Sequence, residues 1–287
     1  MNFANILNHI AETDPEIYER LSPRRKVIRN FVQKVSLTAL PFAIGGLFNK
    51  AYGQVAPDPI LEVLNFALTL EHLEHEFYKK ALSFSVGPVA PDPLIPSGLD
   101  QQAIIKITNH EWKHVVFLQQ TISSMGKAFI DVPKFDFSAG GAYPTVFDDY
   151  DMFLAIAQTL EDTGVRAYKS GAAVLAEQPE LLKAALRIHT TEARHAAHIR
   201  MMRRNAPSAL IMGDVTPWVT GTESNIAGAN DEIILAYSAE DKTEQMKIQI
   251  VGINGQTFVN EEHATQAFDE PLAVADVLRI ASKFIVT

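Results

Sequence analysis

The chain has 287 residues, a formal net charge of −9 and 47% hydrophobic residues. This hydrophobic content is ample for one large core, and the negative charge argues against a general nucleic-acid-binding protein, which needs clustered Lys and Arg against phosphates. The chain has no cysteine. Disulfides, thiolate metal sites and cysteine nucleophiles are therefore excluded, and any bound metal must be held by histidine and carboxylate side chains.

The N-terminal segment has the layout of an export signal. Residues 20–34 carry six basic residues, including the pair Arg24-Arg25, and no acidic residue. The uncharged stretch 35–48 follows, too short to span a bilayer as a helix, and small residues two apart come next at 51–53. We predict that residues 1–54 form a twin-arginine-type leader that directs the protein to the periplasm. The alternative is a cytoplasmic protein in which this segment is an N-terminal helix packed on the rest.

The segment from residue 55 to residue 205 is predicted to form a domain of four long helices, because apolar residues recur at helical spacing. The expected helices cover residues 59–84, 100–126, 147–175 and 179–204.

Residues that typically start or end helices agree with these boundaries. Asp100 is the expected N-cap of the second helix, Gly126 suits its C-terminal end, and Pro179 suits the first turn of the fourth helix. A Pro-rich segment and a short turn join the helices of each pair, whereas the long connection Lys127–Pro144 joins the pairs. This order predicts an all-α, four-helix bundle with one long crossover, the ferritin-like version of the bundle.

Residues 206–287 have a different character and are predicted to form an irregular extension that packs on the bundle. Ile233–Tyr237 and Lys247–Val251 are strand-like in pattern, with turn residues after the second. Pro271–Ile285 is predicted to be a final helix.

An internal repeat relates the two helical hairpins. The sequence Ala-Leu-Thr-Leu-Glu at 67–71 returns as Ala-Gln-Thr-Leu-Glu at 157–161. The partner helices also correspond, since Glu-x-x-His at 111–114 matches Glu-x-x-His at 192–195. The chain therefore contains two related hairpins.

Each hairpin offers one Glu from its first helix and a Glu-x-x-His from its second, whose two side chains share one helix face. Together they supply four carboxylates and two imidazoles, the ligand set of di-iron and di-manganese bundles, and four carboxylates balance two divalent ions. Mixed oxygen and nitrogen donors suit Fe or Mn. Glu111 and Glu192 can bridge the two ions, with Glu71 and Glu161 as terminal ligands. The predicted metal ligands are Glu71, Glu111, His114, Glu161, Glu192 and His195.

Other polar residues near these positions have weaker claims to a role. Glu74 is the rival of Glu71, but its repeat counterpart is Gly164, which cannot be a ligand, so Glu71 is favoured. Tyr78 and Tyr168 follow the ligand glutamates by two helical turns; they either pack with satisfied hydroxyls or act as hydrogen-bonding partners or radical relays of the site. The remaining histidines of the domain are predicted to be solvated or structural: His72, His75, His110, His189 and His198.

Residues 57–204 resemble the ferritin-like superfamily. More narrowly, Thr-Leu-Glu-x-Leu-Glu-x-x-Phe-Tyr at 69–78 and Ala-Phe-Asp-x-Pro-Leu at 267–272 resemble a bacterial ferritin-like group related to plant desiccation-associated proteins. The resemblance implies a non-haem di-metal site, and the twin-arginine-type leaders of that group support export. Many di-iron relatives place an Asp before the Glu of each Glu-x-x-His to orient a histidine, but here those positions are His110 and Thr191.

These observations predict a di-metal protein with redox chemistry on O2 or peroxide in oxidative-stress protection, either peroxidase- or catalase-like or a ferroxidase. The alternative is a non-catalytic stress- or desiccation-related structural or interaction protein in which metal staples the fold. The expected small partner is O2 or peroxide, with no nucleic acid and no stable membrane span. A homo-oligomer is compatible with the sequence, but a storage shell is disfavoured because the C-terminal extension would obstruct it.

Overall fold

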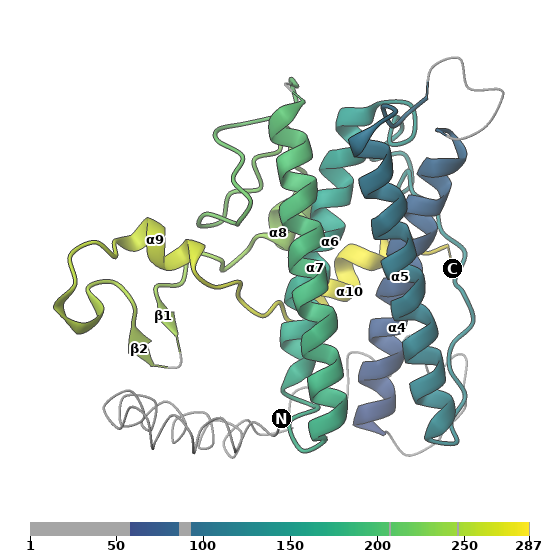
Figure 1. The fold of residues 1–287 in the computed structure, drawn as a ribbon, viewed down its shortest axis with the longest axis horizontal. Helices are drawn as coiled ribbons and strands as arrows, with labels where there is room; N and C mark the ends of the chain where they lie inside the picture. Colours follow the sequence, from purple (N-terminus) through teal and green to yellow (C-terminus); the bar gives the residue numbers. More distant parts are fainter. Residues whose placement is uncertain (1–57, 86–92, 207, 246, 287) are drawn as a thin grey trace.

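The computed structural model describes residues 58–85, 93–206, 208–245 and 247–286, so the predicted leader over residues 1–54 lies outside the described residues. Four long helices lie side by side in a bundle (Figure 1). They are α4 (Pro59–Ser83), α5 (Leu99–Ser124), α6 (Tyr150–Ala172) and α7 (Pro179–Asn205). The predicted all-α bundle is confirmed.

The topology is two hairpins joined by one crossover. Helix α4 packs closely on α5, and α6 packs closely on α7. The connection between α5 and α6 runs along the outside of the α4–α5 hairpin before it enters α6 (Figure 1). This arrangement places the repeat-related helices α4 and α6 in contact with each other, and likewise α5 and α7.

The helix ends follow their capping residues. Asp58 accepts a hydrogen bond from the Leu61 amide at 3.2 Å, and Asp149 caps α6 by accepting from two amides, so α6 starts three residues later than predicted. Gly126 ends α5 with a φ of 69°, as its predicted role requires. The prediction for Asp100 was wrong: α5 begins at Leu99 after Gly98, and Asp100 lies in the first turn, where it accepts from a tyrosine hydroxyl.

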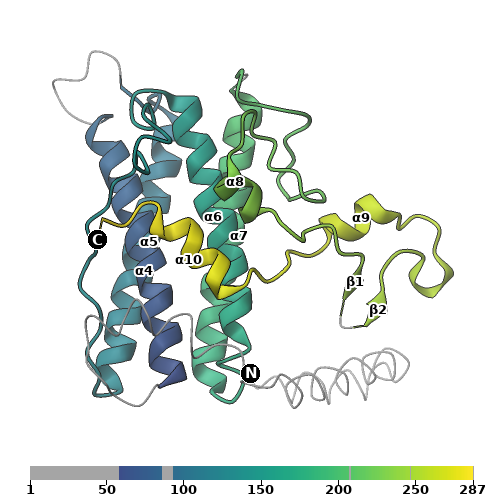
Figure 2. The same cartoon turned by 180° about the vertical axis from the view of Figure 1, so that it is seen from behind.

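The C-terminal extension has one part on the bundle and one part away from it. Helices α8 (Asp231–Ala236) and α10 (Val274–Ser282) pack against α6. Figure 2 shows α10 lying across the bundle, whereas the hairpin and α9 project to one side. The projecting elements are β1 (Glu244–Gln245), β2 (Ile248–Gln249), the short 3-10 helix η1 (Ile253–Gly255) and α9 (Glu261–Gln266).

Two predictions for this extension need correction. Ile233–Tyr237 is not a strand: its first four residues belong to α8 and Tyr237 is the C-cap. Asn230 caps this helix by accepting a hydrogen bond from the Ile233 amide, and the buried Ile233 and Ala236 are one helical turn apart. The second predicted strand is confirmed only as the two residues of β2, since Lys247 turns the chain with a φ of 66°. The final helix is present but shorter than predicted.

A buried ion pair joins the extension to the bundle. The guanidinium of Arg166 on α6 lies 2.6 Å from a carboxylate oxygen of Glu240, and both side chains are almost fully buried. Arg166 also donates to the backbone carbonyls of Ala236, Ser238 and Glu270. Three backbone carbonyls of the extension therefore accept hydrogen bonds from one arginine of the bundle.

No helix in the part of the chain that the structure describes combines the length and apolar character needed to cross a membrane.

We expect Arg166→Met to lower the free energy of unfolding by about 3–5 kcal/mol, because it leaves the buried Glu240 charge without its partner. Chemical denaturation measures this change. The control is Glu76→Gln, which removes the exposed Lys79–Glu76 pair and should cost at most about 1 kcal/mol. Equal effects of the two variants would contradict the stapling role of Arg166.

Candidate metal centre

The six predicted ligands converge inside the bundle. Two of the long helices supply one carboxylate each, and the other two supply one Glu-x-x-His pair each. Glu71 comes from α4, Glu161 from α6, and the two Glu-x-x-His pairs from α5 and α7. All four glutamates are 0% exposed. Two four-residue groups have ligand atoms within 4.8 Å of one another: Glu71, Glu111, His114 and Glu192, and Glu111, Glu161, Glu192 and His195.

The shared members of the two groups are Glu111 and Glu192. These are the two residues that the repeat predicts to bridge, with one glutamate and one histidine left to each side. Because the two groups share these two carboxylates, the cluster is one continuous donor set, and it is compatible with a di-metal site.

His114 anchors the first half of the cluster. Its Nδ1 lies 3.1 Å from Glu71 Oε2, 3.1 Å from Glu111 Oε2 and 3.0 Å from Glu192 Oε1. His195 anchors the second half in the same way, with Nδ1 2.7 Å from Glu111 Oε1, 3.4 Å from Glu161 Oε2 and 3.7 Å from Glu192 Oε2. Each imidazole nitrogen thus faces three carboxylates, two of which it shares with the other imidazole.

Several of these buried atoms form no hydrogen bond among the described residues, although some of them lie at ion-pair distance from one another. They are one oxygen each of Glu111 and Glu161, both oxygens of Glu192, and Nδ1 of His195. Buried polar atoms are normally paired, and buried carboxylates especially so. Unpaired oxygens that converge with an imidazole nitrogen are the donor set that divalent cations with oxygen and nitrogen preferences require, so these residues fit a metal pair.

Two tyrosines cross between the hairpins and hold the outer carboxylates. Tyr78 on α4 donates to Glu161 Oε1 at 2.6 Å, and Tyr168 on α6 donates to Glu71 Oε1. Both rings are buried. Of the two predicted roles, the contact to a candidate ligand is the one that the geometry supports, and it also satisfies each hydroxyl. Each hairpin therefore orients the terminal carboxylate of the other.

The chain belongs to the ferritin-like domain family. A model of that family, described as a ferritin-like domain, matches residues 60–205, just over half of the chain. No curated protein matches the sequence. The matched range begins with α4 and ends with α7, so it is the ferritin-like bundle that carries all six candidate ligands.

The position before each Glu-x-x-His behaves differently in the two hairpins. His110 Nδ1 lies 2.9 Å from His195 Nε2, so His110 orients a candidate ligand across the bundle. Thr191 does not do so, since its hydroxyl donates to the Arg187 carbonyl one turn back. His110 was predicted to be solvated or structural, and the structure adds a direct contact with a candidate metal ligand. Its signal in the sequence was its position directly before the Glu of a Glu-x-x-His.

A fifth acidic side chain lies beside the ferritin-like cluster. Glu74 on α4 is 3% exposed, and burial raises its pKa well above the ordinary value, with a further rise from the charges of the cluster glutamates. A Cβ atom at Gly164 would lie 2.9 Å from Glu74 Oε1 and 3.8 Å from Glu192 Oε2. Glycine at 164 therefore makes the room that Glu74 occupies. In the sequence, the signal for a buried Glu74 was the glycine at its repeat counterpart, position 164, where the other hairpin has no side chain.

Burial sets the protonation of the cluster when no cation is present. Burial raises the pKa of Glu71 to about 8 and that of Glu161 well above its ordinary value. Burial would also raise the pKa of Glu192, but the two facing histidines outweigh it and lower that pKa. Burial would lower the pKa of His114 and His195, yet the facing carboxylates raise both. Without metal, protons on Glu71, Glu161 and the two histidines therefore offset the negative charge of the cluster.

The metal-free protein should lose stability as pH rises from about 4.5 to about 8. Glu71 keeps its proton to about pH 8 when folded but only to about 4.5 when unfolded, so the folded state binds more protons between these values. The stability from this proton is complete below pH 4.5 and is lost as pH rises through 8. One such proton changes the free energy of unfolding by about 1.4 kcal/mol per pH unit.

Urea denaturation across this pH range measures the effect. With bound Fe or Mn the trend should reverse, because metal binding requires deprotonated carboxylates and releases protons. Metal-free protein that gains stability with rising pH over this range would contradict the protonated cluster.

Proposed function

We propose that this ferritin-like protein binds two Fe or Mn ions and carries out redox chemistry on O2 or peroxide in protection against oxidative stress. The observation that carries the proposal is the set of buried carboxylate oxygens that have no hydrogen-bond partner and converge with two imidazoles in two overlapping groups. When bound, two such ions would supply two one-electron steps, matching the two-electron reduction of O2 or peroxide.

Each residue of the site would have a distinct task. Glu111 and Glu192 would bridge, Glu71 with His114 and Glu161 with His195 would complete the two sides, and the crossing tyrosines would hold the terminal carboxylates in place through their hydroxyls. The apolar core around the site would exclude bulk water, which strengthens electrostatic interactions within it.

Two reactions suit this site without an organic substrate. In a catalase-like reaction, two molecules of hydrogen peroxide give one O2 and two waters, so no outside reductant is needed. In ferrous oxidation, two Fe(II) ions each lose one electron while O2 gains two electrons and two protons to form hydrogen peroxide. The predicted relation to desiccation-associated proteins agrees with a role under oxidative stress.

Export through a twin-arginine-type leader remains part of this proposal. The pair Arg24-Arg25 and the uncharged stretch after it support a periplasmic location. Fractionation of the native host tests it, with cytoplasmic recovery of the whole pool as the contradicting result.

Purified wild-type protein should take up about two Fe or Mn per chain on anaerobic addition, measured by elemental mass spectrometry. Glu192→Ala removes a bridging ligand shared by both sides and should lose most of both ions. The matched control on the same helix is Glu180→Ala, whose side chain is 89% exposed and which should keep full metal content. Uptake by Glu192→Ala equal to that of the control would sink the two-ion assignment.

The metal-loaded protein should turn over peroxide or consume O2 with ferrous iron, and Glu161→Ala should lose this activity because a terminal ligand is gone. Oxygen-electrode assays measure both reactions in one instrument. Metal that raises the melting temperature without any turnover would instead favour the non-catalytic alternative, in which the ions only neutralise the buried carboxylates.

A further inference from the structure

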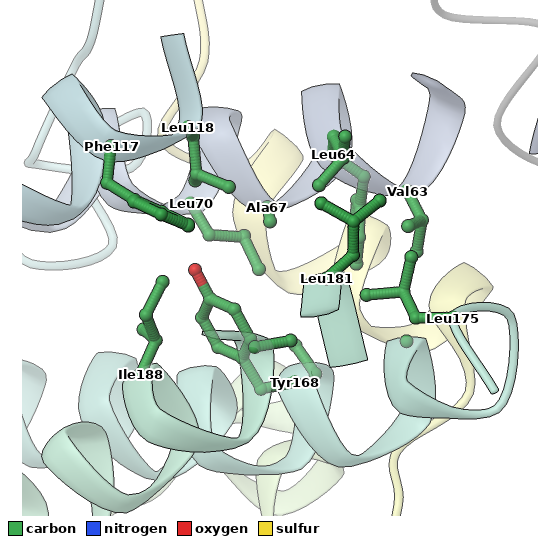
Figure 3. Close-up of a pocket in the computed structure, with 14 residues that line it drawn as sticks. Val63, Leu64, Ala67, Leu70, Phe117, Leu118, Tyr168, Leu175, Leu181 and Ile188 are labelled. Atoms are coloured by element: carbon green, nitrogen blue, oxygen red, sulfur yellow. The ribbon is translucent and has the colours of Figure 1, made fainter. Parts of the chain in front are cut away.

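An apolar cavity lies within the bundle, between α4 and α5 on one side and α6 and α7 on the other. Side chains from all four helices line it, among them Ala67, Leu70, Phe117, Leu118, Tyr168 and Ile188 (Figure 3). The empty space amounts to about 510 Å³ including the mouth, of which about 30 Å³ is open to the centre of a water-sized molecule. The cavity is therefore narrow, with room for a small molecule.

The cavity adjoins one half of the candidate metal centre. Tyr168 forms part of its wall, and in Figure 3 the Tyr168 hydroxyl points across the cavity toward the α4–α5 side. That hydroxyl donates to Glu71, which belongs to the His114 half of the centre. A molecule in the cavity would thus be separated from a terminal ligand by a single side chain.

The repeat-related tyrosine has different surroundings. Tyr78 is enclosed by aromatic rings, with ring centroids 5.5 Å from Phe77 and 6.1 Å from Phe153. The cavity is thus a feature of the Glu71–His114 side, where Ala67, Ala185 and Gly171 contribute small side chains or none.

The lining decides what kind of molecule the cavity accepts. Every lining side chain except that of Tyr168 is apolar or glycine, and the Tyr168 hydroxyl already has its acceptor. Water or hydrogen peroxide would lose hydrogen bonds on entry, whereas an apolar molecule would lose none. One water-sized molecule needs about 10–15 Å³ on the same measure, so about two small molecules fit.

We infer that this cavity is a binding site for dioxygen, which it supplies to the Glu71–His114 half of the centre. The inference rests on the proposed function and deepens it, since it selects dioxygen over peroxide as the substrate that the fold concentrates. Peroxide, being polar, would have to reach the centre by another route. The cavity binds the molecule without any chemical change, so the residues that line it need only be apolar and small.

Xenon tests the cavity apart from the metals, because it occupies dry apolar cavities of this kind. Metal-free wild-type protein should shift the ¹²⁹Xe NMR signal in a saturable way. Ala67→Leu places three more carbon atoms in the lining and should abolish most of that shift. The matched control is Ala103→Leu, which makes the same change at another half-buried alanine, on α5 and outside the cavity. Xenon binding that is absent in the wild type, or equal in both variants, overturns the cavity assignment.

Metal-loaded protein then tests the substrate. With metal content equal to wild type, Ala67→Leu should slow O2 consumption severalfold while its reaction with hydrogen peroxide stays unchanged, and Ala103→Leu should alter neither. Equal slowing of both reactions would mean general damage and would overturn the selection of dioxygen. Xenon binding by a chain that takes up no metal would leave the cavity in place but overturn its assignment as a dioxygen site, and the proposed function with it.

Discussion

Five carboxyl groups buried together, with no ion pair to a lysine or arginine in the described part of the chain, constrain this structure more than any other feature. Glu71, Glu74, Glu111, Glu161 and Glu192 lie together in the core, and the imidazoles of His114 and His195 lie at ion-pair distance from the four candidate ligands among them. Isolated ionised carboxylates in such a place would be very unfavourable. The cluster therefore needs protons or metal ions, and in the absence of metal burial favours the protonated forms of Glu71 and Glu161, whose pKa values it raises.

The remaining packing follows from this constraint. Carboxylates from four different helices can meet only if the hairpins are held face to face, and the crossing tyrosine contacts join the hairpins at that point. The Arg166–Glu240 pair then fixes the extension against α6, with α10 lying across the bundle (Figure 2). Buried ion pairs contribute little net stability, so the value of this pair lies in specifying where the extension docks.

The two halves of the centre are related by the repeat but are not equivalent. His110 orients His195, while Thr191 makes no matching contact to His114. Glu74 occupies space that Gly164 leaves free, and the apolar cavity adjoins Tyr168. The two halves would therefore give two bound ions different surroundings.

Much of this could be predicted from the sequence because it depends on local spacing. Helical periodicity and the repeat fixed the bundle, the crossover and the six clustered residues, since Glu-x-x-His places its two side chains on one face. The extension was harder: Ile233–Tyr237 has a strand-like composition, but the Asn230 cap and contact with α6 make it helical. The His110–His195 contact and the cavity depend on how helices distant in sequence meet, which no local pattern encodes.

The most direct test of the account is anomalous diffraction from crystals soaked anaerobically with Mn(II). Two manganese peaks are expected inside the bundle. One should lie beside Glu71 and His114 and the other beside Glu161 and His195, with Glu111 and Glu192 between them. A single peak, or no peak within this cluster at saturating metal, would contradict a two-metal centre.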